Sequence, residues 1–115
     1  MKHDEMYDSA VRASGDLGAF FEFDGETGYF YLAEVYGPES IRIVGYVHVF
    51  TGFPDFTESD VRVVWDDEEL RVGLLIRNRL WALFDEDRGP HGGGYGVVAE
   101  PRLPAGSKEA FEPRS

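Results

Sequence analysis

The chain has 115 residues, a formal net charge of −11 from 22 acidic and 11 basic residues, 15% aromatic residues and no cysteine. This length suits one domain, and the aromatic content favours a packed β protein over a disordered chain. The charge disfavours direct nucleic-acid binding, which depends on phosphate neutralisation, and the lack of cysteine excludes disulfide and thiolate chemistry.

The first strand is predicted at residues 17–23. Residues 1–16 lack a sustained period, so we expect a flexible N-terminal arm there. Residues 29–34 return as the second strand of a hairpin, and the turn at 24–28 contains two glycines available for positive φ. The aromatic side chains of this hairpin favour core packing and cross-strand pairing over a ligand platform. One face of the first strand carries three apolar residues: Ala19, Phe21 and Phe23.

Residues 41–50 form the longest predicted strand. Alternation places four apolar side chains on one face: Ile41, Ile43, Val47 and Val49. Gly45 lies within that row, which predicts either a β-bulge or space for a large side chain from a facing element. Residues 51–60 follow as the longest irregular segment between strands, where a binding surface is expected.

Residues 61–84 predict a three-stranded meander. A four-residue loop at 66–69 would pair Trp65 with Leu70 and Val63 with Val72, which keeps both apolar rows on one face.

The second turn of the meander allows two registers. We favour a two-residue turn at Arg77 and Asn78, because asparagine tolerates positive φ; it would pair Leu74 with Trp81. A three-residue turn that includes Arg79 would instead pair Leu74 with Ala82.

The remaining chain adds little regular structure to the prediction. Residues 85–94 are rich in acidic residues and glycine and are expected to be irregular, residues 95–99 predict a short last strand, and residues 102–115 predict a disordered tail. The fold is therefore predicted to be all-β: a small antiparallel meander of six or seven strands, forming a curved sheet or partly closed barrel over residues 17–101, with flexible termini.

Residues 21–33 read F-E-F-D-G-E-T-G-Y-F-Y-L-A. This segment resembles the F-E-D-D-G-E-T-G-Y-F-Y-A segment of a small bacterial family of unknown function, which continues with a V-W hairpin and an A-x-F-D strand; Val64-Trp65 and residues 82–85 correspond here. The resemblance spans roughly residues 17–96. It implies a bacterial origin, but it does not indicate any particular activity. Phe23 replaces an acidic residue of that segment, so no acidic-site role carries over to this turn.

Acidic turns are expected to gather at the two ends of an up-and-down sheet. Asp24 and Glu26 would share one end with residues 51–60, while Glu39 and the acidic residues of 66–69 and 85–87 would share the other. Their spacing matches no calcium-binding loop. We therefore expect no metal and no cofactor.

The histidines and serines give no catalytic signature. His3, His48 and His91 lack the short spacing of a zinc site, and no serine lies in a G-x-S-x-G setting. No apolar run approaches the roughly 20 residues of a membrane span, and the N-terminus lacks the apolar core of a signal peptide. We expect a cytoplasmic protein without catalytic residues.

The leading functional hypothesis is a non-enzymatic acidic binding module, of an immunity or regulatory type, that binds a basic protein. Residues 51–60 combine apolar anchors with a charged rim, a mixture typical of protein interfaces. The predicted partner-binding residues are Phe53, Asp55, Phe56, Glu58 and Asp60.

The alternative hypothesis is a small-molecule-binding or enzymatic β-barrel with a ligand in its mouth. Its pocket would be lined by four aromatic residues: Tyr29, Tyr31, Tyr46 and Trp81. A homodimer formed through an exposed aromatic face is a third hypothesis.

Overall fold

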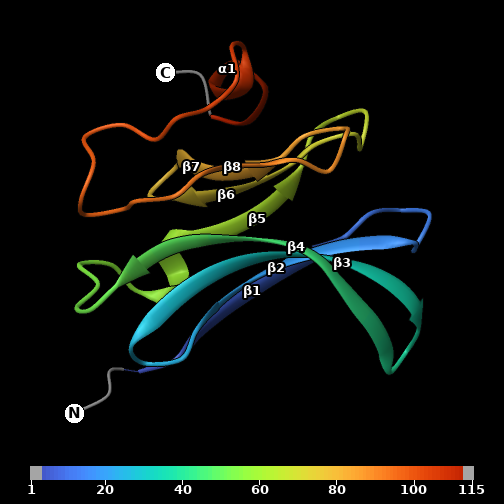
Figure 1. Ribbon diagram of the computed structural model, residues 1–115, viewed down its shortest axis with the longest axis horizontal. Helices are drawn as coiled ribbons and strands as arrows, with labels where there is room; N and C mark the ends of the chain where they lie inside the picture. Colours follow the sequence, from blue (N-terminus) through green and yellow to red (C-terminus); the bar gives the residue numbers. More distant parts are fainter. Residues whose placement is uncertain (1–3, 113–115) are drawn as a thin grey trace.

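The computed structural model describes residues 4–112 and confirms an all-β fold (Figure 1). Eight strands form two four-stranded antiparallel sheets that are not closed into a barrel, rather than the six or seven strands expected. The first sheet consists, in spatial order, of β1 (Met6–Val11), β2 (Leu17–Phe23), β3 (Thr27–Gly37) and β4 (Ser40–Thr51). The second consists of β5 (Val61–Trp65), β6 (Val72–Ile76), β7 (Arg79–Phe84) and β8 (Pro90–Gly92).

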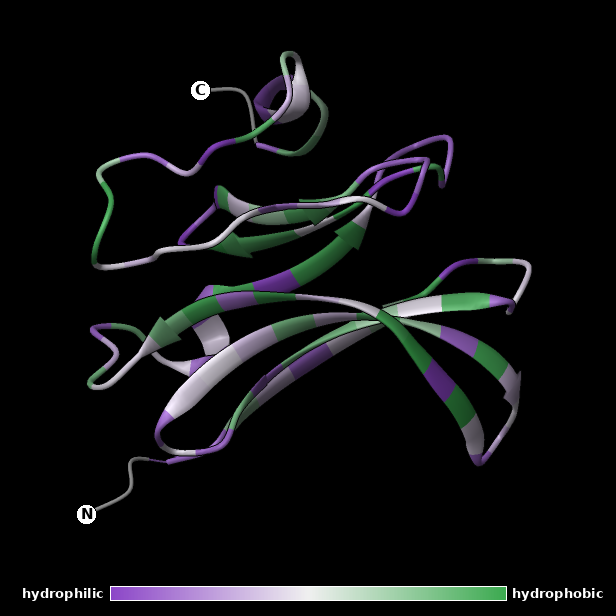
Figure 2. Cartoon of the chain, viewed as in Figure 1, coloured by the Kyte–Doolittle hydropathy of each residue, from purple (hydrophilic) through white to green (hydrophobic). Residues whose placement is uncertain are grey.

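The two sheets lie face to face, with the main hydrophobic core between them (Figure 1). Two short helical segments complete the described chain: the 3-10 helix η1 (Glu58–Asp60), which leads into β5, and α1 (Ser107–Phe111), which lies on the far side of the second sheet. The hydrophobic colour is strongest in the strands of the second sheet, while the strands of the first sheet are more mixed (Figure 2).

Residues 6–11 form the edge strand β1, where the sequence indicated part of a flexible arm. The strand could not be recognised from alternating apolar residues, because an acidic residue, Asp8, occupies one of its inward positions. The Asp8 carboxylate turns toward β5 and accepts a hydrogen bond from the backbone N–H of Val63 at 2.7 Å. The Trp65 indole N–H donates to the Ala10 carbonyl at 3.0 Å. These contacts join the adjacent edges of the two sheets.

Gly45 provides both features that the sequence indicated. Leu32 pairs with Gly45 but Ala33 pairs with Ile43, so the register shifts at this point of β4. A Cβ on Gly45 would lie 2.9 Å from the ring of Phe84, so the glycine leaves room for that ring.

The register shift also corrects the predicted face of β4. Val47 and Val49 are buried, but Ile41 and Ile43 are exposed. An extra residue in one strand turns all preceding side chains to the opposite face, which explains why the predicted four-residue row divides into two pairs.

The first turn of the meander differs from the prediction by two residues. Trp65 pairs with Val72, and Val63 with Leu74. The side chain of Asp66 accepts hydrogen bonds from the backbone N–H groups of Leu70 and Arg71, which extends the loop to residue 71. Because the shift is an even number of residues, the predicted apolar face is preserved.

The second turn confirms the two-residue prediction but not its register. Arg77 and Asn78 have φ values of 53° and 66°, and Ile76 pairs directly with Arg79. Positive φ at both central residues is the geometry of a tight hairpin turn. An irregularity beyond Leu75 then pairs Leu74 with Ala82, so the predicted pairing of Leu74 with Trp81 is wrong.

The C-terminal third is more ordered than the sequence indicated. Residues 90–92 form β8 within the segment expected to be irregular, whereas the last strand predicted at 95–99 is absent from the described structure. Residues 107–111 form α1 within the predicted tail, and the Glu112 carboxylate accepts a hydrogen bond from the Leu80 N–H. A second hydrophobic cluster joins this segment to the outer side of the second sheet: Val64, Leu75, Leu80, Leu83, Leu103 and Phe111. Residues 1–3 and 113–115 lie outside the described part.

Candidate functional site

The two sheets differ in how their outward sides are covered. The C-terminal segment packs on the second sheet, but no element within residues 4–112 crosses the outward side of the first sheet, the lower side in Figure 1. We call this surface the outer face and define it by ten of the outward residues of β1–β4: Tyr7, Val11, Phe20, Glu22, Tyr29, Tyr31, Ile41, Ile43, Tyr46 and His48.

Six rings on the outer face form a continuous row across all four strands. The row follows from period-2 alternation on each strand and from a register that sets Phe20 opposite Tyr31 and Tyr31 opposite Tyr46. The ring centroids lie 6.0 Å apart for Tyr7–Phe20, 4.9 Å for Phe20–Tyr31, 5.8 Å for Tyr31–Tyr29, 6.1 Å for Tyr29–Tyr46 and 5.3 Å for Tyr29–His48.

The charges at the outer face are acidic. Glu22 is exposed on β2 and pairs in register with Tyr29. Burial raises the pKa of Tyr31, and the negative charges of Glu22 and Asp24 raise it further. β1–β4 contain no lysine and a single arginine, Arg42, which alternates to the other side of the sheet and pairs with Glu34. The outward positions of these strands therefore carry no lysine or arginine.

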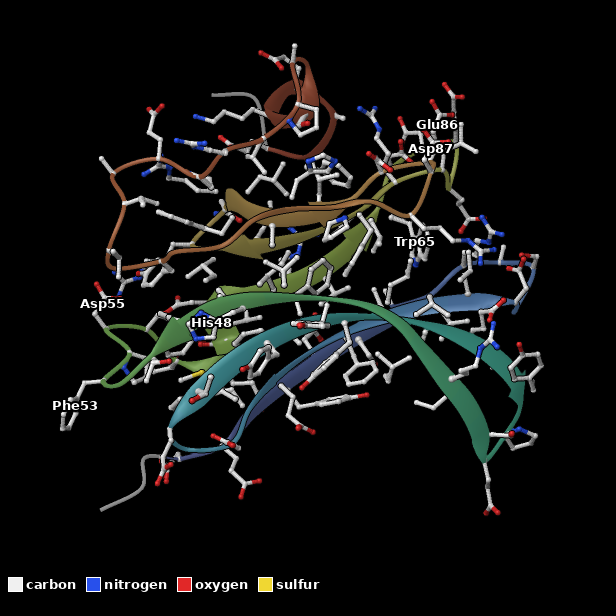
Figure 3. The ribbon with its side chains drawn as sticks, in the orientation of Figure 1. His48, Phe53, Asp55, Trp65, Glu86 and Asp87 are labelled. Atoms are coloured by element: carbon white, nitrogen blue, oxygen red, sulfur yellow. The ribbon has the colours of Figure 1, made fainter. Side chains whose placement is uncertain are left out.

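The two predicted aromatic anchors of the 51–60 loop differ in exposure. Phe53 is 84% exposed and points away from the protein (Figure 3). Phe56 is 5% exposed and packs against Phe50 and Tyr95, so its predicted role as an exposed anchor is wrong. An apolar residue in a loop gives no sign of which way it points, because that depends on the element packed beside it.

The three predicted carboxylates of this loop are held by hydrogen bonds. Asp55 accepts one from the Tyr95 hydroxyl, Glu58 one from the Tyr7 N–H at 3.0 Å, and Asp60 one from the Thr57 N–H at 3.0 Å. The loop is thereby held against β1. A groove of about 430 Å³ lies between the two, lined by Asp4, Glu5, Met6, Pro54, Phe56, Thr57 and Glu58.

Tyr95 is expected to ionise later than an ordinary tyrosine. Burial and the hydrogen bond to Asp55 raise its pKa to about 12. In an alkaline titration followed by absorbance at 295 nm, Tyr95→Phe should remove signal only from the most alkaline part of the curve, near pH 12. Loss of signal at lower pH instead would show that the Tyr95 hydroxyl is open to solvent.

The predicted pocket residues do not share a pocket. Tyr29, Tyr31 and Tyr46 are neighbours on the outer face, but Trp81 is buried between the sheets, with its ring 4.9 Å from that of Tyr95. A separate cavity of about 100 Å³ opens between the sheets near Arg12, Trp65 and Phe84. Ligand pockets usually measure about 300–1,000 Å³, so this cavity is small for an organic ligand.

The acidic turn at residues 85–87, predicted at the end of the sheet opposite the 51–60 loop, makes structural contacts. His91 Nε2 lies 2.7 Å from Asp85 Oδ2, and the hydrogen bond between them lowers the pKa of Asp85. Glu86 and Asp87 point into solvent at the same end (Figure 3). Within residues 4–112, no cluster of three or more histidine, aspartate or glutamate side chains has the arrangement to hold a metal ion.

These observations define an all-β protein of two stacked sheets, one of which exposes an aromatic face with one carboxylate, that of Glu22. A family model described as an uncharacterised protein conserved in bacteria (DUF2251) matches residues 3–105. The chain belongs to this family, which agrees with its resemblance to a bacterial family of unknown function. No curated protein and no solved structure matches the chain significantly. In the described part of the chain, no helix has the length and apolar character needed to cross a membrane.

Proposed function

We propose that this DUF2251 protein is a non-enzymatic binding module for a basic protein, of an immunity or regulatory type, and that the outer face is its binding surface. The observation that carries this proposal is the uncovered aromatic row of the first sheet, with the carboxylate of Glu22 beside it and no lysine or arginine at the outward positions of its strands.

The composition of the outer face suits a protein partner. Exposed contiguous apolar patches mark interaction sites, and tyrosine is enriched among the residues that contribute most to binding. Tyr46 is 63% exposed at the centre of β4, and Ile41 and Ile43 extend the apolar area along the same strand. Cross-strand contacts hold the rings in place, so binding would cost little side-chain entropy.

The charge favours a basic partner. The formal net charge of −11 would attract a positively charged protein over long range and speed its association. The 51–60 loop extends the surface, since Gly52 N–H donates to the Glu26 carbonyl at 2.8 Å and so joins the loop to the acidic turn after β2. Phe53 lies at the tip of that loop.

Affinity purification with mass spectrometry from the native host would test the proposal. A basic protein should be recovered at low salt and lost at high salt, because salt screens the attraction between surface charges. Tyr46→Glu should reduce recovery by roughly 30-fold or more, the effect of losing a central interface residue.

Tyr36→Glu is the matched control. Tyr36 is also a tyrosine with 63% exposure on the first sheet, but its hydroxyl bonds Glu34 on the opposite side. The Tyr36→Glu variant should therefore capture the partner as the wild-type protein does. Recovery of no basic protein, or equal recovery with Tyr46→Glu, would refute the proposal. Phe53→Ala would measure the contribution of the loop without disturbing the core.

A further inference from the structure

Tyr29 lies at the centre of the aromatic row and has three ring neighbours. The Tyr31 ring stacks against it at an interplanar angle of 29°, with the ring centroids 5.8 Å apart. The rings of Tyr46 and His48 stand at 67° and 65° to Tyr29 and form a wall on the β4 side. The result is a corner of aromatic rings that is open to solvent.

A carboxylate stands on the other side of this corner. Glu22 is the register partner of Tyr29 on β2, and side chains directly opposite each other on one face of a sheet have Cβ atoms about 4.5–5.5 Å apart. Aromatic rings beside an exposed carboxylate attract a cation in two ways. The negative faces of the rings attract it, and so does the negative charge of the carboxylate.

The planar guanidinium group of arginine fits this arrangement better than the ammonium group of lysine. It stacks on aromatic rings, is weakly hydrated and presents a fork of donors to a carboxylate. The chain itself uses this contact twice elsewhere: Arg12 Cζ lies 5.7 Å from the ring centroid of Trp65, and Arg79 Cζ lies 5.6 Å from that of Trp81.

We infer that the outer face recognises arginine side chains of its protein partner, with a guanidinium stacked on Tyr29 and Tyr31 and paired with Glu22. This inference rests on the proposed function and specifies the chemistry of the partner: a segment whose arginines cross the strands along the aromatic row. Tyr29 and Tyr31 supply selectivity for arginine over lysine, and Glu22 supplies attraction for either cation.

Titration with synthetic peptides tests the inference. The probes are an acetylated peptide that alternates arginine and threonine, the same peptide with lysine, and the same peptide with citrulline, which keeps the planar shape of arginine without its charge. The wild-type protein should bind the arginine peptide about two- to fivefold more tightly than the lysine peptide, the range of an exposed cation–π contact. The citrulline peptide should bind far more weakly than either.

Three variants separate the contributions. Replacing both Tyr29 and Tyr31 by leucine keeps apolar side chains and should abolish the preference for arginine over lysine. Glu22→Gln should weaken both peptides by a similar factor and reduce the salt dependence of binding. Glu39→Gln makes the same charge change in an exposed turn between β3 and β4 and should behave as the wild-type protein. Circular dichroism checks that each variant is folded.

The outcomes distinguish the inference from the proposed function. Equal affinity for the arginine and lysine peptides, or an arginine preference that survives replacement of both Tyr29 and Tyr31 by leucine, would overturn the inference even if a basic partner is captured through Tyr46. A wild-type chain that forms dimers in light scattering, with Tyr46→Glu monomeric, would show that a second copy occupies the outer face and would overturn both.

Discussion

Replacing Phe84 by alanine is expected to lower the free energy of unfolding by about 3–5 kcal/mol, a large part of the total stability of a small domain. The Phe84 side chain is fully buried between the sheets, with its ring centroid 5.2 Å from that of Phe30. Its ring also fills the space above Gly45. Truncation would leave a cavity that touches both sheets, and neither can collapse into it without moving its backbone.

Urea unfolding followed by circular dichroism would measure this loss. Leu70→Ala is the control, because Leu70 is exposed beside the first turn of the meander and should change stability by no more than about 0.5 kcal/mol. A double-mutant cycle tests the contact itself. Gly45→Ala should cost about 1–3 kcal/mol by overpacking against Phe84, and less in a Phe84→Leu background. A loss below about 1 kcal/mol for Phe84→Ala would contradict the sheet packing described.

Replacing Asp66 by alanine is expected to lower the free energy of unfolding by about 1–3 kcal/mol, the cost of leaving a buried donor without its acceptor, because the donors that would lose Asp66 are only part-buried. The buried carboxylate accepts hydrogen bonds from Leu70 N–H at 2.9 Å, Arg71 N–H at 3.1 Å and Arg71 Nε at 3.0 Å. Without it the loop between β5 and β6 loses the contacts that define its length. Asp67→Ala, one residue further along at an exposed position, should have little effect.

The contribution of Asp66 should also depend on pH. Burial alone would raise the pKa of this carboxyl, but hydrogen bonds from Arg71 and Leu70 outweigh it and lower the pKa. A group with a lowered folded-state pKa adds stability above its unfolded pKa, about 3.9, and loses it as the pH falls through the folded value. The difference in urea midpoint between the wild-type protein and Asp66→Asn should therefore be largest near neutral pH and shrink below about pH 4. A constant difference would refute this account.

The candidate site was only partly predictable. Alternation placed Tyr29 and Tyr31 on one side of their strand, but their neighbours Phe30 and Leu32 are also apolar, so the pattern could not say which side faces the core. The hairpin aromatics were therefore expected mainly in core and cross-strand packing. In the structure Phe30 and Leu32 are buried, while the tyrosines form part of the outer face. The signal that separates them is the polar hydroxyl of tyrosine, which favours a half-exposed position.

The 51–60 loop also shows that the local sequence does not reveal whether an aromatic side chain is exposed or buried. Length and composition marked this segment as a surface, and Phe53 is exposed accordingly. Phe56 has the same side chain three residues later, but it is buried because Phe50 and Tyr95 provide a place for its ring. Tyr95 is far away in the sequence, so no local pattern contains this information.

The sequence by itself determined the properties that depend on neighbouring residues: the all-β class, the strand at 17–23, the tight turn at Arg77 and Asn78, and the space at Gly45. Alternation, positive φ and the missing Cβ act locally, so they can be recognised in the linear chain. Only the tertiary structure decided the rest. The Asp66 hydrogen bonds moved the register of β5 and β6, the shift at Gly45 turned Ile41 and Ile43 outward, and the C-terminal segment covered the second sheet while leaving the first one open. The Asp66 hydrogen bonds reach only four and five residues along the chain, but the alternation of apolar residues does not show them. The other two features depend on which distant surfaces meet, because burial is satisfied between elements rather than within them.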